Sequence, residues 1–223
     1  SNPENTVIGD RAYSGDPGRA ADAAAWVDGG MREAGIISVW KHFPGHGNTA
    51  TDSHQALPVV ELSREDWARG DAVPFRRAVE CGAPAVMAGH IRMTAFDPEY
   101  PASLSHVLVS EVLREELGFT GVVCTDDLTM GAISDTYGMG EAAVLAVEAG
   151  CDLLLVCHGA DNLTQARQAL LGAVDGGRIS PARLEESVYR ILAIKAEYGL
   201  TNQTVEAPDV AALNQAVQAL LGE

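Results

Sequence analysis

The sequence predicts an α/β fold built on a parallel β-sheet. Short apolar runs without polar alternation recur along the chain, as expected of strands that are buried on both faces. Between them lie segments whose apolar residues recur at helical spacing, and this alternation indicates βαβ units. The chain has 223 residues, of which 47% are hydrophobic and 21% charged, so it can form one domain with a substantial core.

Four segments are expected to form the strands of the sheet. They comprise residues 36–40, 85–89, 121–125 and 152–157. Helices are expected within residues 20–34, 63–82, 105–118, 139–149, 180–199 and 210–221. Residues that favour helix N-termini support these boundaries, namely Ser63 with Asp66, Ser105, Ser180 followed by Pro181, and Asp209. Asp152, which precedes the fourth strand, is interpreted as a structural acid.

Charge and cysteine content narrow the function classes. Acidic residues outnumber basic ones 31 to 15, and the resulting net charge of −16 disfavours nucleic acid as a partner. No apolar run reaches the ~20 residues of a membrane-spanning helix, and residues 1–5 do not resemble the start of a signal peptide. The four cysteines, Cys81, Cys124, Cys151 and Cys157, are expected to be buried free thiols, with a disulfide or a thiolate nucleophile as the alternatives.

Polar and ionisable residues follow every predicted strand. Lys41 and His42 end the first strand, where a charged or polar group is costly unless it binds something, so a ligand contact is expected. His90 and His158 follow the second and fourth strands. Because the carboxyl ends of parallel strands share one edge of the sheet, these side chains should lie close to a common site.

Carboxylates at the same edge suggest acid–base or nucleophilic chemistry. Asp126 follows the third strand and is a candidate nucleophile or electrostatic stabiliser, while Asp127 is a candidate helix cap or structural acid. Asp52 and His54 have a spacing that suits a carboxylate orienting an imidazole, although such pairs also arise by chance. His46 is interpreted as a turn residue, with a catalytic role as the alternative.

Other chemistries receive less support. His42, His46, Asp52 and His54 could together hold a metal, but Pro44 and Gly45 prevent the helix on which the H-x-x-x-H spacing binds well. The chain contains neither a G-x-G-x-x-G sequence nor a P-loop, and it lacks the G-x-S-x-G elbow of serine hydrolases.

The segment KHFPGHG at residues 41–47, followed by Asp-Ser-His at 52–54, resembles the signature of glycoside hydrolase family 3. It is most similar to the β-N-acetylglucosaminidase branch, which includes bacterial enzymes of peptidoglycan recycling. Residues 7–14, 88–91, 125–130 and 187–200 resemble further segments of this family, so the resemblance extends from about residue 2 to residue 200.

The resemblance implies a fold and a set of site residues. The fold would be a (β/α)8 barrel of the TIM type that lacks its first strands in this chain, with a barrel domain at 1–200 and a tail carrying a short helix at 201–223. Asp126 would be the nucleophile of a retaining mechanism, His54 the general acid/base and Asp52 its partner. Residues expected to bind the substrate are Arg11, Lys41, His42, His90 and Met130. Neither a metal nor an organic cofactor is expected.

The expected activity is hydrolysis of terminal non-reducing β-linked N-acetylglucosamine from peptidoglycan or chitin-type fragments. A β-glucosidase of the same family and a non-catalytic carbohydrate-binding fragment are the alternatives, a metal hydrolase is less favoured, and phosphorolysis is a conceivable side activity. The expected partner is a carbohydrate, with neither nucleic acid nor membrane, and with self-association through exposed sheet edges. A cytoplasmic location is favoured, and secretion stays open because the natural N-terminus is expected to be absent.

Overall fold

The chain folds around a parallel β-sheet, as the sequence predicts. The computed structural model describes residues 5, 8–49, 57–204 and 206–222. Its main sheet has four parallel strands in the order β1 (Val39–Phe43), β3 (Ala85–Ala88), β5 (Val122–Asp127) and β6 (Leu153–Leu155). A second, two-stranded parallel sheet pairs β2 (Val59–Val60) with β4 (Arg92–Met93).

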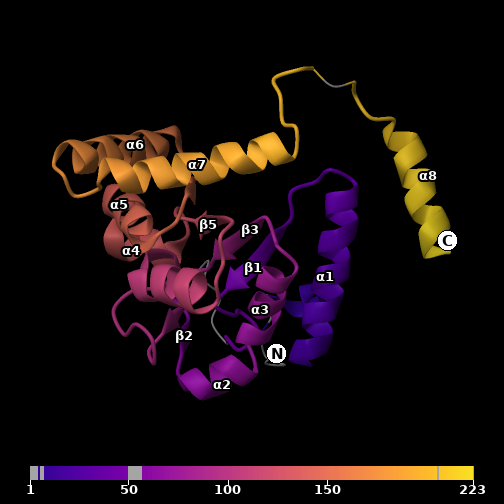
Figure 1. Ribbon diagram of the computed structural model, residues 1–223, viewed down its shortest axis with the longest axis horizontal. Helices are drawn as coiled ribbons and strands as arrows, with labels where there is room; N and C mark the ends of the chain where they lie inside the picture. The colour runs from indigo at the N-terminus through magenta and orange to yellow at the C-terminus, as the bar shows by residue number, and fades with distance from the viewer. Residues whose placement is uncertain (1–4, 6–7, 50–56, 205, 223) are drawn as a thin grey trace.

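One helix precedes the first strand, and others connect the strands or follow the last of them (Figure 1). The α-helices are α1 (Pro17–Glu33), α2 (Arg64–Arg69), α3 (Ala72–Glu80), α4 (Gly131–Tyr137), α5 (Met139–Ala149), α6 (Ala160–Asp175), α7 (Pro181–Glu197) and α8 (Val210–Leu221). Two 3₁₀ turns, η1 (Gly9–Arg11) and η2 (Ala102–Leu104), and a π-helix, η3 (Val107–Glu116), complete the set. The predicted caps are confirmed, because the side chains of Ser63, Ser105, Ser180 and Asp209 each accept a backbone N–H of the following helix.

Several boundaries differ from the prediction. The first strand begins at Val39 rather than at residue 36 and continues through Lys41 and His42, which therefore lie within it. The helix expected at 63–82 is divided into α2 and α3 at Gly70, and the helix expected at 105–118 has π-type hydrogen bonding. The third strand extends two residues further, through Asp126 and Asp127. The short strands β2 and β4 were not predicted.

The two faces of the main sheet have different surroundings. Strand order follows chain order, and since crossovers between parallel strands are right-handed, the connecting helices all lie on one face. Side chains on that face belong to the main hydrophobic core, namely Trp40, Val86, Ala88 and Val123. The register places alternate residues on the opposite face, here called the open face: Val39, Ala85, Met87, Val122, Cys124 and Leu153. These residues do not belong to that core. Val39 and Leu153 on the outer strands are 40% and 45% exposed, whereas Ala85, Val122 and Cys124 on the inner strands are buried.

Asp152 attaches α7 to the sheet. Its fully buried carboxylate accepts hydrogen bonds from Arg114 at 2.6 Å, Ser187 at 2.8 Å, Arg190 at 3.1 Å and the backbone N–H of Val123 at 3.0 Å. Since a buried carboxylate is stable only when it is paired, this cluster fixes the start of β6. The structural role predicted for Asp152 is confirmed.

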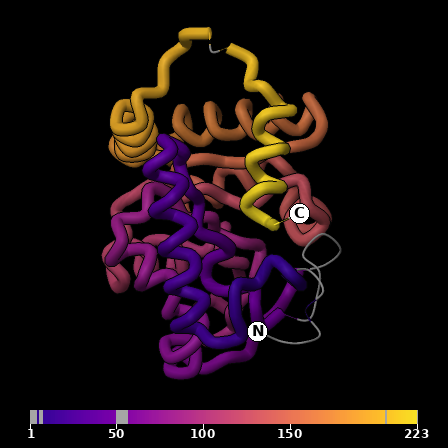
Figure 2. The backbone as a smooth tube through the Cα atoms, turned by 90° about the vertical axis from the view of Figure 1, so that its right-hand side faces the viewer, coloured from indigo at the N-terminus to yellow at the C-terminus, as the bar shows by residue number. Residues whose placement is uncertain are grey.

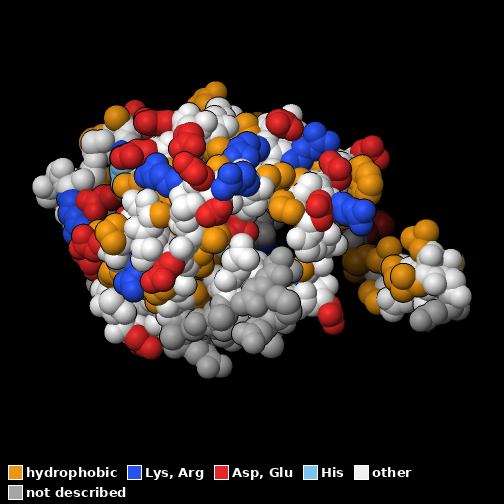
Figure 3. Space-filling model, turned by 90° about the horizontal axis from the view of Figure 1, so that it is seen from below, with side chains coloured by type: hydrophobic (Ala, Val, Ile, Leu, Met, Phe, Trp, Pro, Cys, Tyr) orange, Lys and Arg blue, Asp and Glu red, His pale blue; other side chains and the backbone are white. Residues whose placement is uncertain are grey.

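The C-terminal tail and one cysteine are more exposed than the core elements. After α7, the chain turns over the top of the molecule and descends to α8 (Figures 1 and 2). The apolar side chains of α8 are exposed, and they show in orange at the right of Figure 3. All four cysteines are free, but the expectation that they are all buried is wrong, because Cys157 is exposed beyond the end of β6 and Cys81 is half-buried. Within the described part of the chain, no helix has the length and apolarity needed to cross a membrane.

Candidate active site

An irregularity in β1 brings Lys41 and His42 to the site. Trp40 pairs with Val86 and Phe43 pairs with Ala88, so two residues of β1 occupy the space of one residue of β3. Such bulges locally re-aim side chains. Trp40 and Phe43 stay buried while Lys41 is exposed and His42 is half-buried, so this part of the strand presents both polar groups at its carboxyl end.

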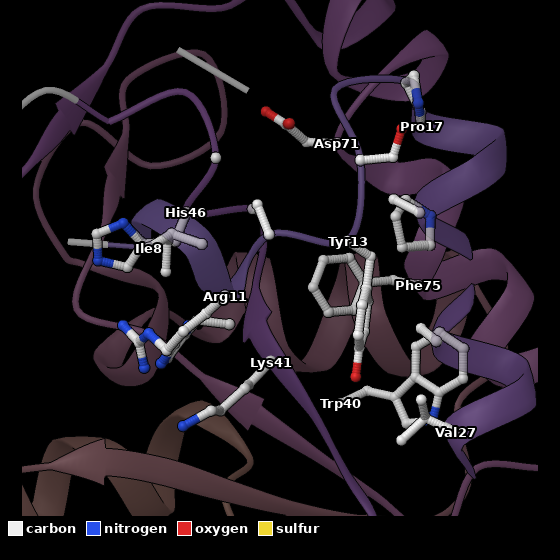
Figure 4. A pocket seen from close by; sticks show the side chains of 18 of the residues that line it. Ile8, Arg11, Tyr13, Pro17, Val27, Trp40, Lys41, His46, Asp71 and Phe75 are labelled. Carbon is white, nitrogen blue, oxygen red and sulfur yellow. The ribbon is translucent and has the colours of Figure 1, made fainter. Parts of the chain in front are cut away.

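Trp40, Lys41 and His42 line a pocket of about 450 Å³ beside β1. Its polar lining includes Arg11, Lys41, His42, His46 and Asp71. Arg11 and Lys41 direct their nitrogens toward the same end of the pocket, whereas the apolar side chains of Val27, Trp40 and Phe75 lie on the other side (Figure 4). The pocket therefore combines cationic and hydrogen-bonding groups with an apolar wall, a composition typical of small-molecule sites.

Asp126 adjoins this pocket through His42. The Asp126 Oδ2 and His42 Nε2 atoms are 3.8 Å apart, and the two side chains are 20% and 10% exposed. Burial lowers the pKa of His42 to about 4, although the nearby Asp126 carboxylate acts in the opposite direction. His42 is therefore neutral at pH 7, and its buried Nδ1 has no hydrogen-bond partner in the described structure. Unpaired buried polar atoms are uncommon and call for a functional explanation.

The two adjacent acids have different environments. One oxygen of Asp127 accepts the backbone N–H groups of Thr129 and Cys157, and the other accepts the Thr129 hydroxyl at 2.6 Å. Burial alone would raise the pKa of Asp127, but these hydrogen bonds outweigh it and lower the pKa below its usual value. The Asp126 side chain accepts the backbone N–H of Asp127 at 2.9 Å through its Oδ1 atom. Asp127 thus fixes the turn that follows β5, while Asp126 lies on the open face, toward His42.

His90 and Met130 are not among the residues that line the pocket. His90 is fully buried, with Nε2 donating to the Asp127 carbonyl at 2.9 Å and Nδ1 lying 2.8 Å from the Ser103 hydroxyl. Since the carbonyl can only accept, Nδ1 accepts the Ser103 proton, and burial lowers the pKa of this neutral ring. Met130 is the half-buried residue that precedes α4. The structure therefore gathers Arg11, Lys41 and His42 and places His90 behind the turn after β5.

His46 takes part in the turn that was predicted for it and also lines the pocket. Its Nδ1 lies 2.6 Å from the Thr49 hydroxyl, and its backbone carbonyl accepts the side-chain amide of Asn5. Both oxygens of Asp71 accept the Asn48 amide, at 2.9 and 2.8 Å, although burial raises the pKa of this carboxyl. Sequence reasoning missed Asp71, which lies about 20 residues from the motif and carries no pattern of its own.

Asp52 and His54, the predicted acid/base pair, lie outside the described residues. Over residues 8–49, 57–204 and 206–222, three His, Cys, Asp or Glu side chains do not gather closely enough to hold a metal ion.

The comparisons with known proteins agree with the predicted family. The model of the glycosyl hydrolase family 3 N-terminal domain matches residues 1–194. The chain belongs to glycoside hydrolase family 3.

Individual relatives show which members of family 3 this chain is similar to. It is 32% identical to a protein named beta-hexosaminidase from Nitrosomonas eutropha over 96% of its own length and 62% of the relative. It is 45% identical to a solved family 3 β-N-acetylglucosaminidase from Paenibacillus sp. str. FPU-7, with a TM-score of 0.90, over 94% of its length and 40% of that protein. A structure titled beta-glucoside phosphorylase BglX is 30% identical with a TM-score of 0.86, over 96% of this chain and 39% of that one. The chain thus spans about 40 to 60% of these relatives.

Proposed function

We propose that this chain carries the catalytic residues of a retaining glycosidase that removes terminal non-reducing β-linked N-acetylglucosamine from peptidoglycan or chitin-type fragments. In this proposal the sheet is part of a (β/α)8 barrel, residues 1–200 form the barrel segment and residues 201–223 form the tail. The observation that carries the proposal is the position of Asp126, at the carboxyl end of β5 and 3.8 Å from His42 of the pocket wall.

Asp126 is assigned as the nucleophile. In the first step its free carboxylate oxygen forms a bond to the anomeric carbon, the bond to the leaving oxygen breaks, and that oxygen takes a proton from a general acid. In the second step water attacks the anomeric carbon and releases Asp126, and the same group removes the proton of the water. Asp127 is less suited to this role because three hydrogen bonds occupy its oxygens.

The pocket wall is assigned to the sugar that reacts. Arg11 and Lys41 can donate hydrogen bonds to hydroxyl oxygens, and neutral His42 can exchange hydrogen bonds with a hydroxyl without placing a second charge beside Asp126. In the family resemblance His54 is the general acid/base and Asp52 orients it. His90 is assigned as a positioning residue, because it holds the carbonyl of Asp127 next to the nucleophile.

The test is turnover of two chromogenic substrates by the full chain. We expect p-nitrophenyl N-acetyl-β-glucosaminide to be cleaved with a kcat/KM at least about tenfold above that of p-nitrophenyl β-glucoside, since the pocket would discriminate the acetamido group. Asp126→Asn should abolish turnover, while Asp135→Asn, which changes an exposed acid of α4, should leave it unchanged. Preference for the glucoside would contradict the substrate assignment, and faster turnover with inorganic phosphate would indicate a phosphorylase. Absence of turnover of either substrate would contradict catalysis by this chain.

A further inference from the structure

The turn at residues 44–49, here called the motif turn, supports the polar wall of the pocket. It follows β1 directly, and its His46 is buried and lines the pocket. The rings of His46 and His42 pack edge to face, with their centroids 5.4 Å apart. His42 in turn lies 3.8 Å from the Asp126 carboxylate. The position of His42 therefore depends on how the motif turn is held.

Two side chains from the segment that contains α2 and α3 hold the motif turn. The buried Trp67 of α2 donates its indole N–H to the carbonyl oxygen of Pro44 at 2.8 Å. Asp71, which directly precedes α3, accepts the side-chain amide of Asn48 at 2.9 Å on one carboxylate oxygen and at 2.8 Å on the other. The first contact fixes the start of the motif turn, and the second fixes the turn near its end.

The Asp71 carboxylate contacts the motif turn rather than its own helix. Asp71 occupies the N-cap position of α3, where an aspartate commonly accepts a backbone N–H of the first turn. Within the described structure its side chain makes no such hydrogen bond. The motif turn also packs closely against it, since a Cβ added at Gly45 would lie 2.5 Å from the Asp71 Cβ atom. Asp71 therefore meets the motif turn at two residues, Gly45 and Asn48.

The location of this carboxylate suits an action on the turn. Figure 4 shows the Asp71 carboxylate at the opposite end of the pocket from the nitrogens of Arg11 and Lys41. Burial raises the pKa of Asp71, and the hydrogen bond from Asn48 acts in the opposite direction. A partly buried carboxylate needs a hydrogen-bond donor, and Asn48 supplies it.

We propose that Asp71 is a positioning residue for sugar binding, because its hydrogen bonds with Asn48 hold the motif turn in the shape in which His46 supports His42. The inference rests on the proposed function, since it takes the sugar to bind beside His42. Asp71 should therefore affect the binding of the sugar and leave the chemical step at Asp126 nearly unchanged.

Two measurements on the full chain test the proposal: binding of N-acetylglucosamine, followed by tryptophan fluorescence, and turnover of p-nitrophenyl N-acetyl-β-glucosaminide. Asp71→Ala should raise the Kd of the sugar and the KM of the glycoside about tenfold each and change kcat less than about threefold, since it removes charge-assisted hydrogen bonds that act on binding. A purely structural role would reduce the folded fraction, which lowers the apparent kcat and leaves KM unchanged. Asn48→Ala removes the same hydrogen bonds from the exposed partner and should give the same shifts. Glu65→Ala, which removes an exposed acid of α2, is the matched control and should change none of the three constants.

Exchange of the two partners tests the hydrogen bond itself. Asn48→Asp alone brings two carboxylates together and should weaken sugar binding at least as much as Asp71→Ala does. Asn48→Asp combined with Asp71→Asn restores one amide donor and one carboxylate acceptor and should return Kd to within about threefold of the wild type.

Unchanged sugar binding in both alanine variants, or an exchange that restores nothing, would overturn the proposal for Asp71. A wild type that binds the sugar without turning over the glycoside, while Asp71→Ala still weakens binding, would contradict the proposed function alone. A wild type that does not bind the sugar would overturn both.

Discussion

Acidification should destabilise the protein through His42. Burial lowers the pKa of this ring from 6.5 to about 4. Between pH 6.5 and pH 4, the unfolded chain therefore binds a proton at His42 that the folded chain does not bind. Stability therefore falls as the pH drops below 6.5 and levels off below pH 4. At about 1.4 kcal/mol per pKa unit, the full loss is about 3 kcal/mol, most of which is complete at pH 4.5.

Urea unfolding of the wild type and His42→Gln at pH 7.5, 6.0 and 4.5 measures this contribution. The glutamine side chain of the variant cannot titrate, and the other ionisable groups contribute almost equally to both proteins, so the difference between the two free energies of unfolding isolates His42. That difference should shift in favour of His42→Gln by about 2–3 kcal/mol between pH 7.5 and 4.5. A difference that stays constant with pH would refute the reasoning.

Three further predictions address the core and the mechanism. Asp152→Ala should lower the free energy of unfolding by about 3–5 kcal/mol, because its arginine partners would remain without a carboxylate, and a loss below about 1 kcal/mol in urea unfolding would contradict this. Gly121→Ala should lower the melting temperature, since the added Cβ would lie 2.6 Å from the Pro84 carbonyl oxygen, whereas Gly29→Ala, with open space around it, should not. His54→Ala should slow cleavage of a disaccharide about 100-fold more than that of a nitrophenyl glycoside, whose leaving group needs little protonation, and equal slowing in steady-state assays would argue against an acid/base role.

The sequence predicted the fold where local patterns and packing agree. The helices expected at residues 139–149 and 210–221 correspond to α5 and α8, with the predicted boundaries. The first strand was placed three residues too early, because Ile36 and Ile37 look like strand residues while Lys41 and His42 look like the loop after it. Pairing with β3 decides that boundary, and it depends on residues more than 40 positions away.

The site was predictable in its composition and less so in its geometry. Motif position identified Lys41, His42 and Asp126, which the structure brings together around one side of the sheet. The motif could not show that both ring nitrogens of His90 form hydrogen bonds within the protein. Their partners, the Ser103 hydroxyl and the Asp127 carbonyl, are brought to His90 only by the fold. Cys157 was expected to be buried because it ends an apolar run, but β6 is an edge strand and ends two residues earlier.

Identification of the glycosylated residue tests the central claim most directly. The full chain is incubated with 5-fluoro-N-acetylglucosaminyl fluoride, which forms a slowly hydrolysed glycosyl-enzyme, and the labelled peptide is sequenced by mass spectrometry. The account predicts one sugar on Asp126, no label in Asp126→Asn, and retained label in Asp127→Asn. A sugar on Asp127, or turnover of the chromogenic substrate by Asp126→Asn at the wild-type rate, would contradict it.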